Sequence, residues 1–269
     1  MDNSPGAYSQ TIALNYSQME KIGIVIQARS GSTRLPGKML KPFFQGKNIL
    51  EILIERLKSN SFGIPVTVAT SELPGDDQIA SVAESSGAKV FRGSESDVMS
   101  RFVQVANGQG LETVVRVCAD NPFLDLALFE RLVSDFKESP SDYRSYRVGE
   151  KPAILTHYGF FCEIVSAGAL EKASKLTEEK LYREHVTNFI YGNPGIFHCE
   201  WTPAPERIVK SENVRLTIDT AGDFATAQMV FGELAKRNLD CSYENVLDIL
   251  EEFPELEKGM KREIDKNSK

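Results

Sequence analysis

The stretch that decides the fold reads Ile22-Gly23-Ile24-Val25-Ile26-Gln27-Ala28-Arg29-Ser30-Gly31-Ser32-Thr33-Arg34-Leu35-Pro36-Gly37-Lys38-Met39-Leu40. It opens with a short, β-branched apolar run, which is typical of a strand buried on both faces. A loop of small and hydroxyl residues with three cations follows. Such a loop suits a triphosphate, because backbone N–H groups between small residues can approach phosphate oxygens while the cations neutralise their charge.

The loop differs from two common phosphate-binding patterns. A Walker A loop places Ser or Thr after its lysine, whereas Met39 follows Lys38 here. The spacing also differs from the Gly-x-Gly-x-x-Gly of dinucleotide sites. The alternative interpretation is a solvated basic loop. The clustering of cations directly after a buried strand, in an acidic chain, favours phosphate binding.

The composition is that of an ordinary globular protein, with 41% hydrophobic and 26% charged residues. A net charge of −7 argues against nucleic acid or an anionic membrane as the main partner. The cysteines are far apart, so the sequence indicates neither a zinc site nor a disulfide framework. No stretch is apolar enough for a signal peptide or a membrane span, and we expect a cytoplasmic protein.

The first half of the chain alternates between strand and helix patterns. Further strands are predicted at 65–70, 88–92 and 111–119, and helices at 48–59, 76–86, 97–107 and 126–137. This alternation predicts an α/β fold in three layers, a mostly parallel sheet with helices on both faces. In such sheets ligands bind beyond the carboxyl ends of the strands.

The second half is less regular. Strands are predicted at 159–165, 195–201 and 214–218, helices at 167–174, 178–191, 222–237 and 243–252, and polar turns at 139–152. The sequence contains no repeat and no linker. We expect one domain over 21–252 with a small inserted region near 140–210, which serves the acceptor or an oligomer contact. A flexible arm (1–20) precedes this domain, and a charged tail (253–269) follows it.

The loop also resembles a known family. Ala28-Arg29-x-Gly31-Ser32-x-Arg34-Leu35-Pro36-Gly37-Lys38 is similar to the nucleotide loop of the cytidylyltransferases that make CMP-activated sugars, of the acylneuraminate and ketodeoxyoctonate type. The nearest branch is that of spore-coat polysaccharide biosynthesis, and the resemblance extends over roughly 21–235. It implies a Rossmann-like nucleotidyltransferase fold with CTP and a small sugar-type acceptor as partners. The nucleotide-binding residues that it implies in the loop are Ala28, Arg29, Ser30, Gly31, Ser32, Arg34 and Lys38.

Two aspartates are candidates for a Mg²⁺ site. Asp120 and Asp219 each follow a predicted strand, where a turn or a helix N-cap is the structural alternative. The resemblance implies that both bind Mg²⁺ and act with Arg29 and Lys38 in catalysis, and Mg²⁺ takes one or two carboxylates beside phosphate oxygens. Two carboxylates at one sheet edge repel each other unless a cation lies between them. For Asp223, a functional role and a helix-terminus role both stay open.

The resemblance implies further contacts. Cytosine and ribose are expected near Ala69, Thr70 and Ser71 and near the pair Asp76-Asp77. Arg92 and Arg101 belong to a segment similar to the family's Arg-Gly-Ser-x-x-Asp-Val-x-x-Arg element. A surface position on a helix is the alternative for Arg101. Acceptor-side candidates are Glu163, Glu184 and His185; a structural role is the alternative for His185. The sequence at 156–162 departs from the family's Pro-Asp-Gly-rich form.

We therefore predict a Mg²⁺-dependent cytidylyltransferase that joins CMP from CTP to a sugar-type acceptor, an eight- or nine-carbon ulosonic acid, and releases pyrophosphate. The product would serve surface polysaccharide or glycan biosynthesis, and we expect a homodimer. One alternative is a nucleotidyltransferase that uses another base or a phosphorylated acceptor. Another is a catalytically silent nucleotide-binding protein.

Overall fold

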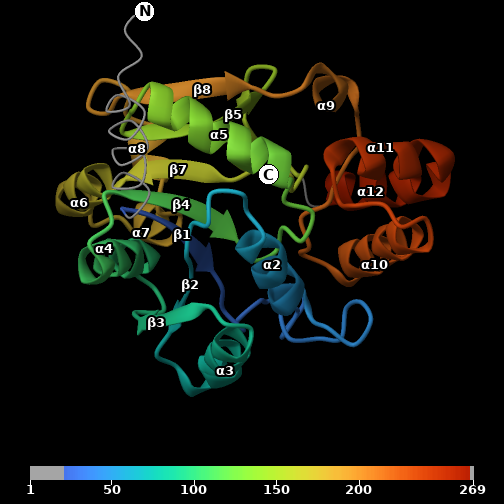
Figure 1. Ribbon diagram of the computed structural model, residues 1–269, viewed down its shortest axis with the longest axis horizontal. Coiled ribbons are helices and arrows are strands. Elements are labelled where there is room, and N and C mark those ends of the chain that lie inside the picture. The colour runs from blue at the N-terminus through green and yellow to red at the C-terminus, as the bar shows by residue number, and fades with distance from the viewer. Residues whose placement is uncertain (1–20, 267–269) are drawn as a thin grey trace, which may run out of the picture.

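An eight-stranded mixed sheet runs through the protein, with helices on both of its faces (Figure 1). The computed structural model describes residues 21–266, so the predicted arm at 1–20 lies outside the described residues. The strand order is β3-β2-β1-β4-β7-β5-β6, and β8 pairs with β5. The predicted α/β class with a mostly parallel sheet is confirmed.

The parallel half of the sheet follows the prediction closely. Its strands are β1 (Ile22–Gln27), β2 (Val66–Ser71), β3 (Lys89–Gly93) and β4 (Thr113–Cys118). Its helical elements are α2 (Ile49–Lys58), the short η1 (Pro74–Asp76), α3 (Asp77–Ser85), α4 (Val98–Gln109) and α5 (Leu126–Glu138). The central strands β1 and β4 are almost fully buried, whereas the edge strand β3 is partly exposed.

The inserted region extends the sheet. The predicted turn region contains β5 (Tyr143–Val148), which pairs with β7 (Glu163–Ser166), with β6 (Lys151–Pro152) and with β8 (Cys199–Pro203). The prediction of turns was wrong here because strands pair with the backbone of β5 on both sides and its polar side chains find partners within the fold. Ser145, for example, donates a hydrogen bond to the carbonyl of Cys162 at 3.0 Å. The short η2 (Ala153–Leu155) and α9 (Glu206–Lys210) complete this region.

The single helix predicted at 178–191 is interrupted. After α6 (Ala167–Leu176), the chain forms α7 (Lys180–Glu184) and α8 (Asn188–Tyr191). Between them the buried Val186 has a φ of 47°, a left-handed value that β-branched residues rarely adopt. Sequence periodicity cannot show such a break. Its consequence is that Thr187 lies beside β7, where its hydroxyl contacts Glu163.

The strand predicted at 214–218 is also absent from the described fold. This segment is extended but bonds to loops: the Leu216 N–H donates to the carbonyl of His157 at 2.8 Å, and the Ile218 N–H donates to that of Asp120 at 2.9 Å. The segment passes close to the backbone of Gly159. A glycine is required there, because its φ is 72° and an added Cβ would lie 3.1 Å from the Leu216 carbonyl carbon. Asp219 therefore reaches the sheet edge by loop packing.

Three C-terminal helices gather on one side of the molecule, at the red end of the colour scale (Figure 1). They are α10 (Ala221–Lys236), α11 (Tyr243–Glu252) and α12 (Pro254–Lys266). The last of them forms where a charged tail was predicted. Most of its side chains are charged, yet Leu256 and Met260 are buried, which fixes the helix to the core.

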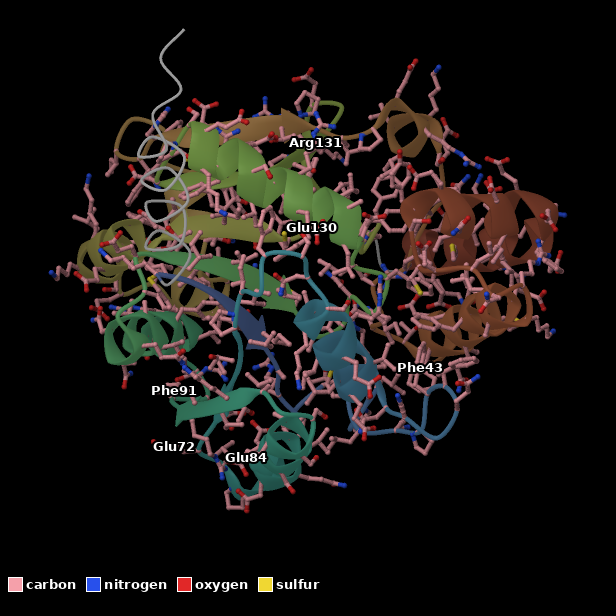
Figure 2. All side chains as sticks on the ribbon, viewed as in Figure 1. Phe43, Glu72, Glu84, Phe91, Glu130 and Arg131 are labelled. Carbon is pink, nitrogen blue, oxygen red and sulfur yellow. The ribbon has the colours of Figure 1, made fainter. Side chains whose placement is uncertain are left out.

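The core lies on both faces of the sheet. Ile24 and Val115 belong to the cluster that includes residues of α2, α5 and α10, whereas Val25 and Val114 belong to the one that includes residues of α4 and α6. The loop after β1 is fixed through Phe43, whose ring lies 5.2 Å from that of Phe224 and near α10 in Figure 2. Within residues 21–266, no helix is long and apolar enough to cross a membrane.

Candidate active site

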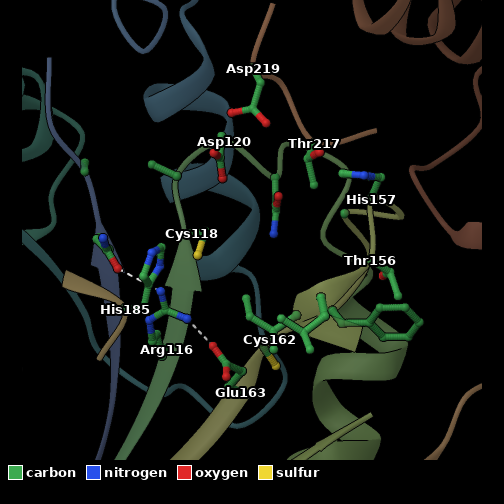
Figure 3. A pocket seen from close by; sticks show the side chains of 18 of the residues that line it. Arg116, Cys118, Asp120, Thr156, His157, Cys162, Glu163, His185, Thr217 and Asp219 are labelled. Atoms are coloured by element: carbon green, nitrogen blue, oxygen red, sulfur yellow. Dashed lines mark hydrogen bonds and ion pairs between the residues drawn. The ribbon is translucent and has the colours of Figure 1, made fainter. Parts of the chain in front are cut away.

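A cavity of about 550 Å³ opens at the carboxyl ends of β1 and β4 (Figure 3). The loop after β1 lines part of this cavity, next to the segments that carry Asp120 and Asp219. The predicted site residues that line this cavity are Ala28, Arg29, Gly31, Ser32, Arg34, Lys38, Asp120, Glu163, Glu184, His185 and Asp219. The fold thus brings most of the predicted residues together.

Lys38 lies between the two predicted metal ligands. Its Nζ is 3.2 Å from Asp120 Oδ2 and 3.3 Å from Asp219 Oδ1, and it also donates to the carbonyl of Ile218. The carboxylates are therefore separated by at most about twice that distance. In this arrangement the ammonium group of Lys38 supplies the cation that two neighbouring carboxylates need.

Asp219 has two further cationic neighbours. Arg34 Nη2 lies 3.1 Å and Arg215 Nη2 lies 3.3 Å from Asp219 Oδ2. Burial raises the pKa of Asp219, but the charges of Lys38, Arg34 and Arg215 outweigh that effect and hold the pKa below its usual value. The Asp219 carboxylate is therefore ionised, with one buried cationic neighbour, Arg215, and two on the loop after β1.

Asp223 has a structural role. Its carboxylate accepts hydrogen bonds from the fully buried Arg215, through Nε at 2.7 Å and Nη2 at 3.0 Å. It also accepts from the Thr220 N–H, and the Thr220 hydroxyl caps the Asp223 N–H in return, which forms a capping box at the start of α10. The open question about Asp223 is thus answered by its contacts.

The buried carboxylate of Asp76 fixes the start of the phosphate loop. It accepts from the Ser30 N–H at 2.7 Å and from the N–H and hydroxyl of Ser71 at the end of β2. Burial alone would raise the pKa of Asp76. The hydrogen bonds lower the pKa by more than burial raises it, so the pKa lies below its usual value. The family resemblance implied a position near cytosine and ribose for Asp76, and its role in holding the loop after β1 was not predicted.

Several of the predicted nucleotide-binding residues, most of them expected near the base and ribose, do not line the cavity. Among the described residues that line the cavity, Ser30, Ala69, Thr70, Ser71, Arg92 and Arg101 are missing. Arg92 donates to the carbonyls of Ser71 and Leu73 at 3.0 Å, and Arg101 is fully buried with Nη1 3.2 Å from the carbonyl oxygen of Ala69. Their contact with a nucleotide stays a prediction.

The acceptor-side candidates occupy the other end. Arg29 Nη2 lies 3.0 Å from Glu184 Oε1, and His185 and Arg116 both line the cavity (Figure 3). Glu163 is buried in a pair with Arg116, which the sequence analysis missed. A charged residue in the middle of an otherwise apolar strand, as Arg116 is in β4, was the signal available for finding it.

Comparison with known proteins agrees with this geometry. The model of a family described as Cytidylyltransferase matches residues 23–261. The spore coat polysaccharide biosynthesis protein SpsF of Bacillus subtilis is 32% identical over 242 residues, 88% of this chain and 97% of that protein. A 3-deoxy-manno-octulosonate cytidylyltransferase of Geobacter sulfurreducens is 31% identical over 122 residues, 45% of this chain and 47% of that protein. The solved structure of a cytidylyltransferase from Leptospira borgpetersenii has a TM-score of 0.78 at 30% identity, covering 88% of this chain and 96% of that one.

Proposed function

This chain belongs to the cytidylyltransferase family, and we propose that it transfers CMP from CTP to a sugar-type acceptor, an ulosonic acid, with release of pyrophosphate. One observation carries the proposal: the cations Arg34 and Lys38 of the loop and the pair Asp120 and Asp219 meet in direct contact at one cavity. Two relatives are named a spore coat polysaccharide biosynthesis protein and a 3-deoxy-manno-octulosonate cytidylyltransferase. These names support the acceptor class and a role in polysaccharide biosynthesis. The homodimer and the cytoplasmic location stay predictions.

The loop cations are suited to hold the phosphates of CTP. Arg34 and Lys38 each contact a carboxylate at 3.1 to 3.3 Å, and a triphosphate offers the same kind of anionic oxygen. Binding of CTP would therefore exchange one set of partners for another without leaving a cation unpaired. Lys38 would move from the two aspartates toward the phosphates, and the aspartates would then need another cation.

Asp120 and Asp219 fit Mg²⁺ by donor type and position. They already converge on a cation, the Lys38 ammonium group, at 3.2 and 3.3 Å. No group of three or more His, Cys, Asp or Glu that could hold a metal occurs among the described residues. A pair of carboxylates is what Mg²⁺ uses when substrate phosphates and waters complete its coordination. When bound, the ion would neutralise charge on the attacked phosphate.

The reaction needs orientation more than covalent chemistry. An acceptor oxygen forms a bond to the α-phosphorus, the bond from that phosphorus to the β-bridging oxygen breaks, and pyrophosphate leaves with the electron pair. The acceptor hydroxyl releases its proton. The loop cations would stabilise the leaving pyrophosphate, and the cavity walls would align the acceptor.

The test is pyrophosphate release from CTP, with Mg²⁺, against a panel of ulosonic acids and sugar phosphates. We expect turnover with an ulosonic acid, and CTP should be preferred over UTP because UTP lacks the 4-amino donor. Turnover with a sugar phosphate alone, or equal turnover with UTP, ATP and GTP, would contradict the proposal. CTP binding without turnover of any acceptor would indicate a silent nucleotide-binding protein.

A further inference from the structure

A second charged cluster lies at the inner wall of the cavity. Arg116 of β4 and Glu163 of β7 form an ion pair whose side chains are only 5% and 4% exposed (Figure 3). Gln27, the last residue of β1, lies beside them and also lines the cavity. The sequence analysis assigned no role to Gln27 or Arg116.

The carboxylate of Glu163 is fully used by protein donors. Its Oε1 accepts from the Tyr143 hydroxyl at 2.6 Å and from the Thr187 hydroxyl at 2.8 Å, while its Oε2 accepts from Arg116 Nη1. A buried carboxylate that accepts from three donors is held in one orientation. This arrangement suits a residue that fixes Arg116 better than one that binds a substrate directly.

Arg116 in turn fixes the amide of Gln27. Its Nη2 donates to Gln27 Oε1 at 2.9 Å. A guanidinium group has donors and no acceptor, so the amide oxygen of Gln27 must face Arg116 and the amide NH₂ must point away. Within residues 21–266, the NH₂ of Gln27 makes no hydrogen bond, and the residue is half-buried at the cavity surface.

We propose that Gln27 is a specificity residue that donates its amide NH₂ to an oxygen of the acceptor, a hydroxyl or a carboxylate, and that Arg116 and Glu163 are its positioning residues. The proposal rests on the proposed function. The groups that orient Gln27 come from β4, β5, β7 and the segment after α7, on the side of the sheet away from β2 and β3. The cations suited to phosphates belong to the loop at 28–38 instead. The backbone of Gln27 pairs with Ala69 of β2, but its side-chain amide is held by Arg116 of β4, and this contact assigns the amide to the acceptor rather than to CTP.

The kinetic test uses the acceptor with the highest turnover in the panel. Gln27→Glu keeps an oxygen toward Arg116 and replaces the donor NH₂ by an anionic oxygen, while Gln27→Met removes both polar groups. We expect each variant to raise the acceptor KM by about tenfold or more, the effect of one lost hydrogen bond to a polar substrate group. The Kd of CTP, measured by calorimetry, should stay unchanged. Gln104→Glu, at an exposed position of α4, is the matched control for the added charge.

A double-mutant cycle separates positioning from a general structural effect. Arg116→Lys keeps the charge, but the lysine ammonium group lacks the two separate Nη donors that contact Glu163 and Gln27. Its effect on the acceptor KM should disappear in the Gln27→Met background, because Arg116 acts on the acceptor only through Gln27. An equal effect of Arg116→Lys in both backgrounds would overturn its positioning role. Thermal melts of every variant verify folding.

A second readout requires no turnover. The side-chain NH₂ signals of Gln27 in ¹⁵N-labelled protein should shift when the acceptor used in the kinetic test is added to the CTP-saturated protein without Mg²⁺, and not when CTP is added alone. A shift with CTP alone, or no shift with either ligand, would overturn the assignment. An unchanged acceptor KM in an active Gln27→Glu variant would do the same. Failure of the proposed function is distinct from these outcomes, since the wild-type protein would then release no pyrophosphate from CTP.

Discussion

Two ion-pair clusters line the same cavity and differ in burial. At the phosphate end, Lys38, Asp120 and Asp219 have side chains that are 10%, 30% and 17% exposed, and Arg34 beside them is 43% exposed. At the acceptor end, Arg116 and Glu163 are 5% and 4% exposed. The first cluster is open to solvent through Arg34 and Asp120 and can exchange partners there, whereas the buried Arg116–Glu163 pair is costly to separate. We therefore expect the first cluster to bind charged substrate groups and the second to keep side chains of the cavity wall in position.

The largest expected effect comes from breaking the buried cluster. Arg116→Met would leave the Glu163 charge buried with only the hydroxyls of Tyr143 and Thr187 as partners. We expect a loss of about 3–5 kcal/mol in the free energy of unfolding, measured by urea denaturation. Arg262→Met, at an exposed position of α12, is the control and should change little. Equal, small losses in both variants would show that the buried Arg116–Glu163 pair is not costly to break and would contradict this account.

The next effect is on catalysis at the exposed cluster. Asp120→Asn and Asp219→Asn should each lower kcat by about a hundredfold or more, the scale of one lost electrostatic group. Asp265→Asn, at an exposed position of α12, provides the matched control. Stability should change less than in Arg116→Met, because Lys38 and Arg34 remain partly solvated. Near wild-type kcat in either variant would remove that aspartate from the active site.

A smaller effect concerns the affinity for CTP. Arg34→Ala removes a charge-assisted contact worth about 1.5–3 kcal/mol, so the Kd of CTP should rise about tenfold or more in calorimetric titrations. The same substitution at Lys41, an exposed cation just beyond the loop, should leave the Kd unchanged. Similar affinities of Arg34→Ala and wild type would exclude Arg34 from phosphate binding.

The smallest effect involves a carboxylate fixed by hydrogen bonds instead of cations. Asp76 has a lowered pKa, so ionisation of Asp76 stabilises the folded protein above the ordinary aspartate pKa, near 4, and that stabilisation is lost as the pH falls through the folded-state value. Asp76→Asn should cost roughly 1 kcal/mol at neutral pH. The difference in Tm between variant and wild type should shrink below pH 4. A difference independent of pH would contradict this role of Asp76.

Local patterns in the sequence were sufficient for the parallel half of the fold and for the phosphate loop. In that half, the hydrophobic periodicity and the polar residues at the strand ends can be read from short stretches of sequence. Strands β1 to β4 accordingly appear where they were predicted. The same reasoning failed for β5. This strand lies in a polar stretch that predicted turns, and its pairing with β7 and β8 on its two sides is not visible in the local pattern. It failed again at Val186 and at 214–218, where packing against distant loops decides the backbone. Asp219 was found through its family resemblance, although the strand expected before it does not exist.

The most direct test of the central claim is a calorimetric titration of CTP into the wild-type protein with and without Mg²⁺, repeated with Asp219→Asn. If Lys38 leaves the aspartates for the phosphates and Mg²⁺ takes its place, Mg²⁺ should tighten CTP binding by at least about tenfold in the wild type. The variant should lose most of that dependence on Mg²⁺. Absence of CTP binding, or affinities that are the same with and without Mg²⁺ in the wild type, would contradict the account.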